Sequence, residues 1–309
     1  MAYISRRRFL AGMGQAALIT GVSLISIANA KERPGPKIGL ALGSGGASGL
    51  AHILVIETLE ELGLKPACIS GSSIGAIAGA FVASGHDAKS LRSLVAQLAP
   101  EDLGSWLGQV FKKDRVSLLD MLKIDMDSAG LVNSEAFQSF LLKQLGKERF
   151  EDLEIPLVVT ATDFWEREMV VFGSGPLIPP VMASAALPGI FPPVRHEGKL
   201  LVDGGLVNPV PYDLIIDRAE ITIAVNVLGT RPRPEDDMPG YLDLVFNTFD
   251  IMQANVIHNM LKNREPSIYL EPPVTGIRVL DFHKAESIYN QALPVKDDLK
   301  RQLEKLIKG

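Results

Sequence analysis

The sequence predicts an α/β fold with a mostly parallel central sheet. Two strand–turn–helix units follow each other near the start of the predicted domain. In the first, an apolar strand over residues 37–42 leads through a glycine-rich loop into a helix over residues 50–62. In the second, an apolar strand over residues 66–69 leads through a glycine–serine turn into a helical run over residues 76–82. Because two such units in succession form a βαβ unit, both turns are expected at the same edge of the sheet.

Residues 1–30 are predicted to be a twin-arginine export signal. Three arginines at residues 6–8 precede an apolar region that runs to about Ala28, and residues 28–30 form an A-x-A cleavage pattern. We expect removal of this segment after Ala30 and a periplasmic protein. A membrane anchor that stays attached is the alternative, because the apolar run approaches the length that spans a bilayer.

Residues 31–36 are predicted to be a polar linker, and residues 37–309 to form a single domain. Its motifs lie within about residues 38–226, and helices form a C-terminal extension. The whole chain has 31 basic and 36 acidic residues and a net charge of −5. Without the three arginines of the predicted signal, 28 basic and 36 acidic residues give a charge of −8, and this part has no basic run and no interleaving of aromatic and basic residues. This composition argues against nucleic-acid binding. Cys68 is the only cysteine, so no disulfide is expected within the chain, and the oligomeric state is not predicted.

The loop after the first strand has the sequence GSGGASG over residues 43–49. A dinucleotide-binding loop is disfavoured, because Ser48 stands where the last glycine of G-x-G-x-x-G would be and no acidic residue ends the second strand. No lysine follows the glycines, as a P-loop would require. The backbone amides of such a loop can instead converge on an anion, so the loop is a candidate oxyanion hole. A simple strand–helix connector is the other interpretation.

The second turn, over residues 71–75, has the pattern G-x-S-x-G between a strand and a helix, which is typical of a nucleophile elbow. Gly71 and Gly75 flank Ser73, and a side chain at either position would block the tight approach of strand and helix. Unpaired amides at the start of the helix are expected to point toward the Ser73 hydroxyl, where they can stabilise negative charge. An ordinary glycine–serine turn can have the same residues, so other motifs of the chain are needed to distinguish a nucleophile elbow from such a turn.

The middle and the end of the chain supply further helices and strands. Helices are predicted over residues 86–99, 136–145 (capped by Asn133 or Ser134), 181–187, 213–218, 241–262 and 293–308, and strands over residues 155–163, 168–172, 199–202, 221–226 and 267–270. Residues 101–123 do not predict one structure, and residues 231–239 are predicted to be a loop. Asp163 lies before the turn 165–167, where a turn or cap role is favoured over a catalytic one.

Asp203 is the candidate general base. It ends a strand and precedes Gly204 and Gly205, so its carboxylate is closely approachable. Of the five histidines, only His258 and His283 follow it, as the Ser…Asp…His order of α/β-hydrolases requires, and neither stands at a strand end beside glycines. A serine–aspartate dyad, in which Asp203 takes the serine proton directly, needs fewer assumptions.

The GSGGASG loop, the GSSIG turn, the segment ASAALPGIFPP (residues 183–193) and the DGG sequence at residues 203–205 together resemble the ordered motifs of the patatin-like phospholipase family. The chain looks closest to the compact, single-domain bacterial members of that family. The resemblance covers about residues 38–225. It implies a three-layer α/β/α sandwich and a Ser–Asp dyad that acts on acyl esters of lipids.

By position, Ser73 matches the nucleophile of the family and Asp203 the proton acceptor. The oxyanion loop is matched by Ser44, Gly45 and Gly46, and the other motif positions are Gly43, Gly49, Gly71, Gly75, Gly204 and Gly205. There are two departures. Ser44 replaces a glycine, as compact bacterial members also show, and Ser48 replaces a residue that is often basic. The second departure leaves the backbone donors unchanged, but it leaves open how the loop is held and whether a phosphate head group binds there.

The predicted function is that of a serine acyl hydrolase, which cleaves ester-linked fatty acyl groups of phospholipids or other lipids through an acyl-enzyme. The alternatives are a catalytically silent lipid- or acyl-binding protein and an esterase with a Ser-His-Asp triad. Acyl transfer through the same intermediate is a variant. The expected partner is a lipid or another acyl ester, either free or at a membrane surface. No metal or cofactor is predicted, since the chain has no D-x-D-x-D-G calcium loop.

Overall fold

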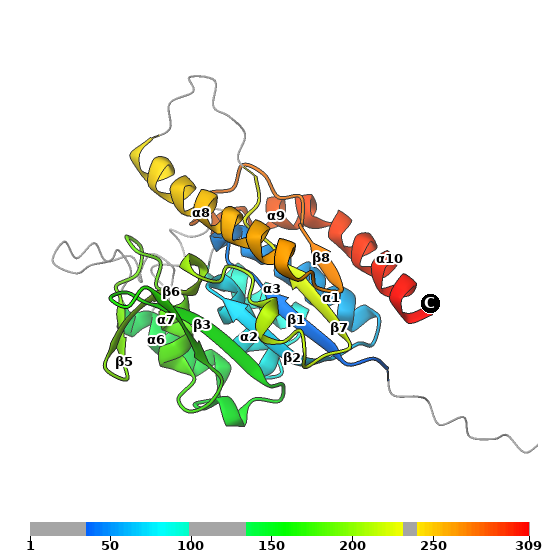
Figure 1. Cartoon of the computed structure of the whole chain (residues 1–309), viewed down its shortest axis with the longest axis horizontal. Helices are drawn as coiled ribbons and strands as arrows, with labels where there is room; N and C mark the ends of the chain where they lie inside the picture. Colours follow the sequence, from blue (N-terminus) through cyan, green and yellow to red (C-terminus); the bar gives the residue numbers. More distant parts are fainter. Residues whose placement is uncertain (1–34, 99–133, 231–239, 309) are drawn as a thin grey trace, which may run out of the picture. The chain divides into compact units, whose positions relative to one another are not determined.

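A central sheet of eight strands organises the part of the chain that the structure describes (Figure 1). The structure is a computed structural model, and it describes residues 35–98, 134–230 and 240–308. The strands are β1 (Ile38–Leu42), β2 (Pro66–Ser72), β3 (Leu157–Asp163), β4 (Glu168–Phe172), β5 (Val194–His196), β6 (Lys199–Asp203), β7 (Ile221–Val225) and β8 (Ile268–Leu270). Their order across the sheet is β5-β6-β3-β2-β1-β7-β8, and β4 pairs with β3.

The inner part of the sheet is parallel, as the sequence predicts. β1 pairs in parallel with β2 and β7, β2 pairs in parallel with β3, and β8 pairs in parallel with β7. β4 and β6 are antiparallel to β3, and β5 is antiparallel to β6. The sheet is therefore mixed and mostly parallel, which confirms the predicted α/β class.

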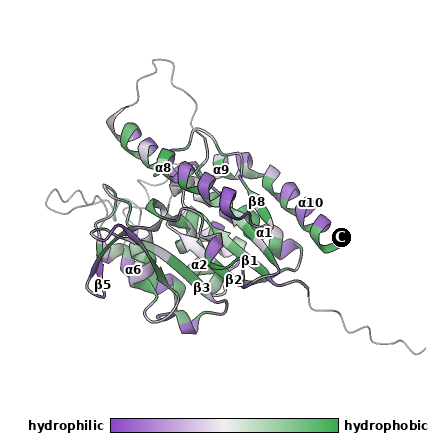
Figure 2. Cartoon of the chain, in the orientation of Figure 1, coloured by the Kyte–Doolittle hydropathy of each residue, from purple (hydrophilic) through white to green (hydrophobic). Residues whose placement is uncertain are grey.

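The centre of the sheet is buried on both faces. All five residues of β1 and all five of β7 are buried, which is the pattern of parallel strands that are covered on both sides. Ile38, Leu40 and Leu42 belong to a large hydrophobic core, whereas Ala41 belongs to a smaller one. Because side chains alternate along a strand, the two cores lie on opposite faces of the sheet. Figure 2 shows hydrophobic residues along the central strands and both kinds of residue along α10.

Helices supply the layers on the two faces. They are α1 (His52–Glu61), α2 (Ile74–Ala83), α3 (Ala88–Leu98), α6 (Ser134–Leu145), α7 (Ile178–Ser184), α8 (Tyr241–Asn263), α9 (Ala285–Ala292) and α10 (Pro294–Lys308), with 3-10 turns η1 (Gly46–Ala51), η2 (Phe150–Asp152), η3 (Gly204–Leu206), η4 (Tyr212–Leu214) and η5 (Phe282–Lys284). Most of these helices pack into the large core. The C-terminal half of α8 and residues 210–219 pack into the smaller core, so the sheet lies between two layers, as the three-layer prediction requires.

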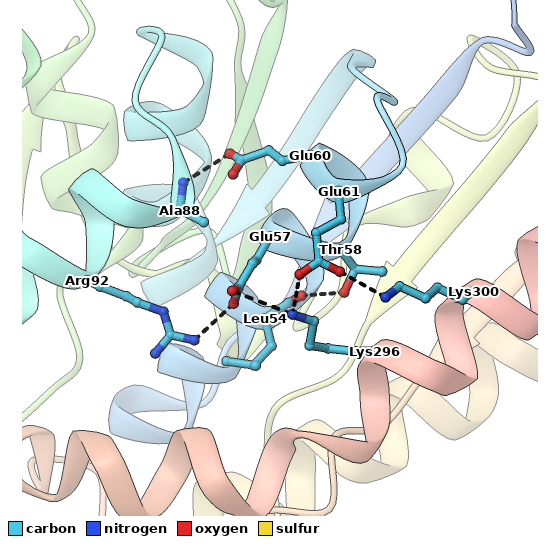
Figure 3. A network of polar contacts seen from close by, with 9 residues as sticks. All are labelled: Leu54, Glu57, Thr58, Glu60, Glu61, Ala88, Arg92, Lys296 and Lys300. Atoms are coloured by element: carbon cyan, nitrogen blue, oxygen red, sulfur yellow. Dashed lines mark hydrogen bonds and ion pairs between the residues drawn. The ribbon is translucent and has the colours of Figure 1, made fainter.

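A polar network connects α1 with its neighbours at the surface (Figure 3). Glu61 accepts hydrogen bonds from Lys296 at 2.6 Å and from Lys300 at 2.8 Å, and Glu57 accepts one from Arg92 of α3 at 2.9 Å. The two lysines lower the pKa of Glu61 to about 2. Exposed ion pairs of this kind contribute less than about 1 kcal/mol each, so hydrophobic burial supplies most of the stability of this helical layer.

The structure departs from the sequence predictions at a few short elements. Residues 213–218, predicted to be helical, form only the end of η4 and irregular turns. A helix of six residues makes too few hydrogen bonds to offset its nucleation cost, and Tyr212 and Ile215 are buried in the smaller core instead. The strand β5 and the helix α9 were not predicted from the sequence.

Several sequence predictions concern residues outside the described ranges. They are the export signal (residues 1–30), most of the linker 31–36, the segment 101–123, the cap residue Asn133 and the loop 231–239. Residues 35–309 group into one unit by their contacts. Among the helices of the described ranges, none combines the length and the apolar character that crossing a bilayer requires.

Candidate active site

One edge of β3 pairs with two strands, β2 and β6, which run in opposite directions and end next to each other. The first half of β3 pairs with β2, where Ser72 lies opposite Thr160. The second half pairs with the antiparallel β6, where Asp203 lies opposite Ala161. The other edge of β3 is occupied by β4. Consecutive residues of β3 therefore place the carboxyl ends of β2 and β6 side by side, and Ser73 follows directly after Ser72.

Ser73 occupies a strained turn between β2 and α2. Its φ of 55° and ψ of −124° lie outside the regions that a residue with a side chain ordinarily adopts. The flanking glycines make this turn feasible. A Cβ on Gly75 would lie 2.0 Å from the Leu42 carbonyl oxygen, and one on Gly71 would lie 2.6 Å from the Cα of Ala76. The geometry is that of a nucleophile elbow, which presents its side chain at the sheet edge.

Two hydrogen bonds fix Ser73. Its hydroxyl donates to Oδ2 of Asp203 at 2.6 Å, and its backbone amide donates to Oγ of Ser184 at 2.9 Å. Ser184 is fully buried at the end of α7, so its hydroxyl is a rigid acceptor. The role of Ser184 is not predictable from the sequence, because no residue near it in the chain indicates that it contacts the turn at Ser73.

Asp203 is held as firmly as its partner. Its backbone amide donates to the Ala186 carbonyl at 3.0 Å, and its own carbonyl accepts from Oγ1 of Thr162 at 2.7 Å. Oδ1 accepts from the Gly205 amide at 2.7 Å. Gly204 lies so close to β3 that a Cβ would be 2.2 Å from the carbonyl oxygen of Thr160. This contact explains why a glycine must directly follow the aspartate.

Burial controls the charge state of Asp203. The side chain is only 1% exposed, and removal from water raises its pKa to about 7, although the hydrogen bonds from Ser73 and Gly205 act in the opposite direction. A carboxylate with a pKa near neutrality is a much stronger base than an exposed aspartate. It can therefore exchange a proton with the serine hydroxyl, to which it is already hydrogen-bonded.

The glycine-rich loop lies beside the dyad at the same sheet edge. The Gly43 amide donates to Val225 at 3.0 Å and the Ser44 amide to Pro209 at 2.8 Å. The amides of Gly45 and Gly46, by contrast, have no hydrogen-bond partner within the described ranges. Of the three predicted oxyanion residues, Gly45 and Gly46 thus have amides available for an anion, while the Ser44 amide is engaged elsewhere.

His52 holds the loop from behind. This residue is fully buried at the start of α1, and its Nε2 lies 2.9 Å from the Gly43 carbonyl oxygen. Burial lowers the pKa of His52 to about 4, so the ring is neutral at pH 7 and donates from Nε2. His52 is not among the residues that line the cavity described below.

An apolar cavity of about 280 Å³ opens onto the dyad. It is lined by Ser73, Asp203 and the loop residues Ser44, Gly45 and Gly46. The rest of its lining consists mainly of aliphatic and aromatic side chains from several helices, among them Ile53, Ile77, Leu94, Phe137, Phe140 and Phe246. Such a cavity fits an acyl chain, with its carbonyl near the serine.

The remaining candidate residues lie elsewhere. His258 and His283 are exposed and are not part of the cavity lining. Asp163 accepts hydrogen bonds from the amides of Trp165 and Glu166 and from Lys199, which is the turn role that the sequence favours.

Comparisons with known proteins show the family to which the chain is similar. The model of the patatin-like phospholipase family matches residues 40–216. An uncharacterized NTE family protein of Mycobacterium tuberculosis is 34% identical over 203 residues, which cover 65% of this chain and 52% of that protein. Lysophospholipase NTE1 of Saccharomyces cerevisiae is 28% identical over 280 residues, which cover 83% of this chain and 16% of that protein.

The chain thus spans about half the length of the mycobacterial relative and a smaller part of the yeast one. Among solved structures, VipD from Legionella pneumophila is similar with a TM-score of 0.44 and 16% identity, covering 86% of this chain and 67% of VipD.

Proposed function

The chain belongs to the patatin-like phospholipase family, and we propose that it hydrolyses ester-linked fatty acyl groups of lipids with Ser73 as the nucleophile and Asp203 as the base. The observation that carries the proposal is the 2.6 Å hydrogen bond from the Ser73 hydroxyl to Asp203 in the wall of an apolar cavity. The relatives named as lysophospholipases support lipid esters as the substrate class.

In the first half of the reaction, the Asp203 carboxylate accepts the Ser73 proton while Oγ attacks the ester carbonyl carbon. The carbonyl oxygen becomes an oxyanion, which accepts hydrogen bonds from the free amides of Gly45 and Gly46. When the tetrahedral intermediate collapses, the bond to the alcohol oxygen breaks and that oxygen takes the proton from Asp203. The alcohol leaves, and the acyl group remains on Ser73.

In the second half, water replaces the alcohol. Asp203 accepts a proton from the water, whose oxygen attacks the acyl carbon and forms a second oxyanion in the same site. Collapse releases the fatty acid, and the proton returns from Asp203 to the Ser73 oxygen. One base thus serves both halves, and its pKa of about 7 suits it to both directions of proton transfer.

The place of action is also a proposal. Residues 6–8 and 28–30 support export through a twin-arginine signal, which would bring the enzyme to the lipids of the periplasmic membrane faces. Amino-terminal sequencing of the exported protein tests it, and a first residue before Lys31 contradicts cleavage after Ala30.

Ser72 provides a matched control for the catalytic test. It is the neighbour of Ser73, it is fully buried, and its hydroxyl has no hydrogen-bond partner in the described structure. Ser73→Ala should abolish hydrolysis of a chromogenic acyl ester and labelling by a fluorophosphonate, whereas Ser72→Ala should retain both. Full activity of Ser73→Ala would exclude the dyad. Ester binding without turnover or labelling in the wild type would instead indicate a catalytically silent lipid-binding protein.

A further inference from the structure

Gln253 is a buried polar residue of the cavity that the proposed mechanism does not use. It lies on α8 and is 5% exposed, and it is part of the lining that also contains Ser73. Its Oε1 atom is buried without a hydrogen-bond partner. The helix α8 packs against η3, the turn that directly follows Asp203. The amide therefore belongs to the same site as the dyad.

An unpaired amide is costly at such a position. A buried acceptor without a donor costs about 1–3 kcal/mol, and most of the side chains around it in the cavity are aliphatic or aromatic. A methionine would fill the same space without that cost. The amide is thus suited to a partner that arrives with the ligand, and a side-chain amide offers both a donor and an acceptor to it.

The charges of the cavity restrict the partner. No lysine, arginine or histidine of the described residues lines it, and Asp250 lies one turn before Gln253 on the same helix. Asp250 already has an interaction of its own. Among the described lining residues, a phosphate group would therefore find no cation to pair with. A neutral hydroxyl, which both donates and accepts, matches the amide.

We propose that Gln253 forms a subsite for a free hydroxyl group on the alcohol part of the ester, so that the part of the substrate bound in the cavity is a neutral, hydroxylated ester such as a monoacylglycerol. The inference rests on the proposed function, since it places the acyl chain and the ester beside Ser73. A phospholipid would fit only with its phosphate outside the cavity.

The test compares two esters of one fatty acid, a 1-monoacylglycerol and a methyl ester. They share the acyl chain and the scissile bond and differ in the glycerol hydroxyls. Gln253→Met, which keeps the length of the side chain, should lower kcat/KM for the monoacylglycerol about threefold to tenfold, the effect of one hydrogen bond. It should leave the methyl ester unchanged. Asn255→Leu is the control, because Asn255 is an exposed amide on the same helix, and its hydrogen bond within the described ranges goes to the Ile251 carbonyl.

Equal losses on both esters, or no loss on either, would overturn the subsite. A binding measurement separates this outcome from a failure of the hydrolase proposal. Calorimetry with a 1-O-alkylglycerol, an ether that no esterase cleaves, should show weaker binding to Gln253→Met than to the wild type by a similar factor. An alkyl methyl ether should bind both equally. Gln253-dependent binding without any ester hydrolysis would refute the proposed hydrolase activity and support the hydroxyl subsite. Ester hydrolysis with the same selectivity in Gln253→Met and the wild type would refute the subsite and support the hydrolase activity.

Discussion

The pKa of Asp203 leads to the sharpest prediction about the reaction. The side chain has to be ionised to accept the Ser73 proton, and burial raises its pKa from 3.8 to about 7. At pH 5 only about one Asp203 in a hundred would be ionised, whereas an aspartate with an ordinary pKa would be almost fully ionised. We therefore expect kcat/KM to rise about a hundredfold between pH 5 and pH 8, with a midpoint near pH 7, because kcat/KM follows the free enzyme.

The assay has to use a product that does not titrate in this range. Released fatty acid from a neutral ester, quantified by mass after quenching, meets that need. Ser72→Ala should show the same profile, because its Ser73–Asp203 pair is intact. A profile that is flat down to pH 5 would refute the reasoning, since it would mean that the base is ionised despite its burial.

The raised pKa of Asp203 also makes the free energy of unfolding depend on pH. Between pH 4 and pH 7 the folded protein holds a proton on Asp203 that the unfolded chain releases, so stability falls as the pH rises through this window. The shift from 3.8 to about 7 corresponds to roughly 4 kcal/mol as an upper limit. Asp203→Asn keeps the shape and removes the ionisation. It should therefore be inactive, yet more resistant to urea than the wild type at pH 8 and no different at pH 4.

Three further predictions concern the surroundings of the dyad. When the pH falls from 6.5 to 4, His52→Gln should lose less stability than the wild type in urea unfolding, by up to about 3 kcal/mol. In the wild type, the buried ring has a lowered pKa and stays neutral through most of this range, whereas the histidine of the unfolded chain binds a proton, which favours unfolding. Gly45→Ala should unfold at a lower temperature, since its Cβ would lie 2.3 Å from the Val227 carbonyl oxygen. Ser184→Ala should lower kcat about tenfold with little change in KM, because the Ser73 amide loses its acceptor.

Local motifs were predictable because their chemistry is carried by neighbouring residues. Gly71 and Gly75 indicate a tight turn around Ser73 without reference to the rest of the chain. In the structure, backbone atoms lie too close to both positions to leave room for a Cβ atom. The two strand–loop–helix units near the start predict a parallel pair of strands in the same way, and β1 and β2 form that pair.

The meeting of Ser73 with Asp203 depends on contacts that span long stretches of the chain. It requires β3 to pair with β2 up to Thr160 and with β6 from Ala161 onward. A shift of one residue in either register would turn the side chains to the other face of the sheet. Neither periodicity nor composition determines this register. The hydrogen bond from the Ser73 amide to Ser184 also joins residues far apart in the chain, so it could not be predicted either. The pairing of Ser73 with Asp203 was inferred instead from the Asp-Gly-Gly sequence after a strand and from the lack of a suitably placed histidine, and the resemblance to ordered family motifs implied the same pair.

Several groups in the cavity lack a partner or are held at a cost, and one species would satisfy them together. The amides of Gly45 and Gly46 have no acceptor within the described ranges, and Asp203 is buried where its charge is unfavourable. A substrate ester would occupy only some of these groups. In the tetrahedral intermediate, the oxyanion accepts from both glycines and the Ser73 proton neutralises Asp203, so these interactions are strongest near the transition state. Because only such differential binding accelerates a reaction, the unsatisfied groups are better explained by catalysis than by passive lipid storage.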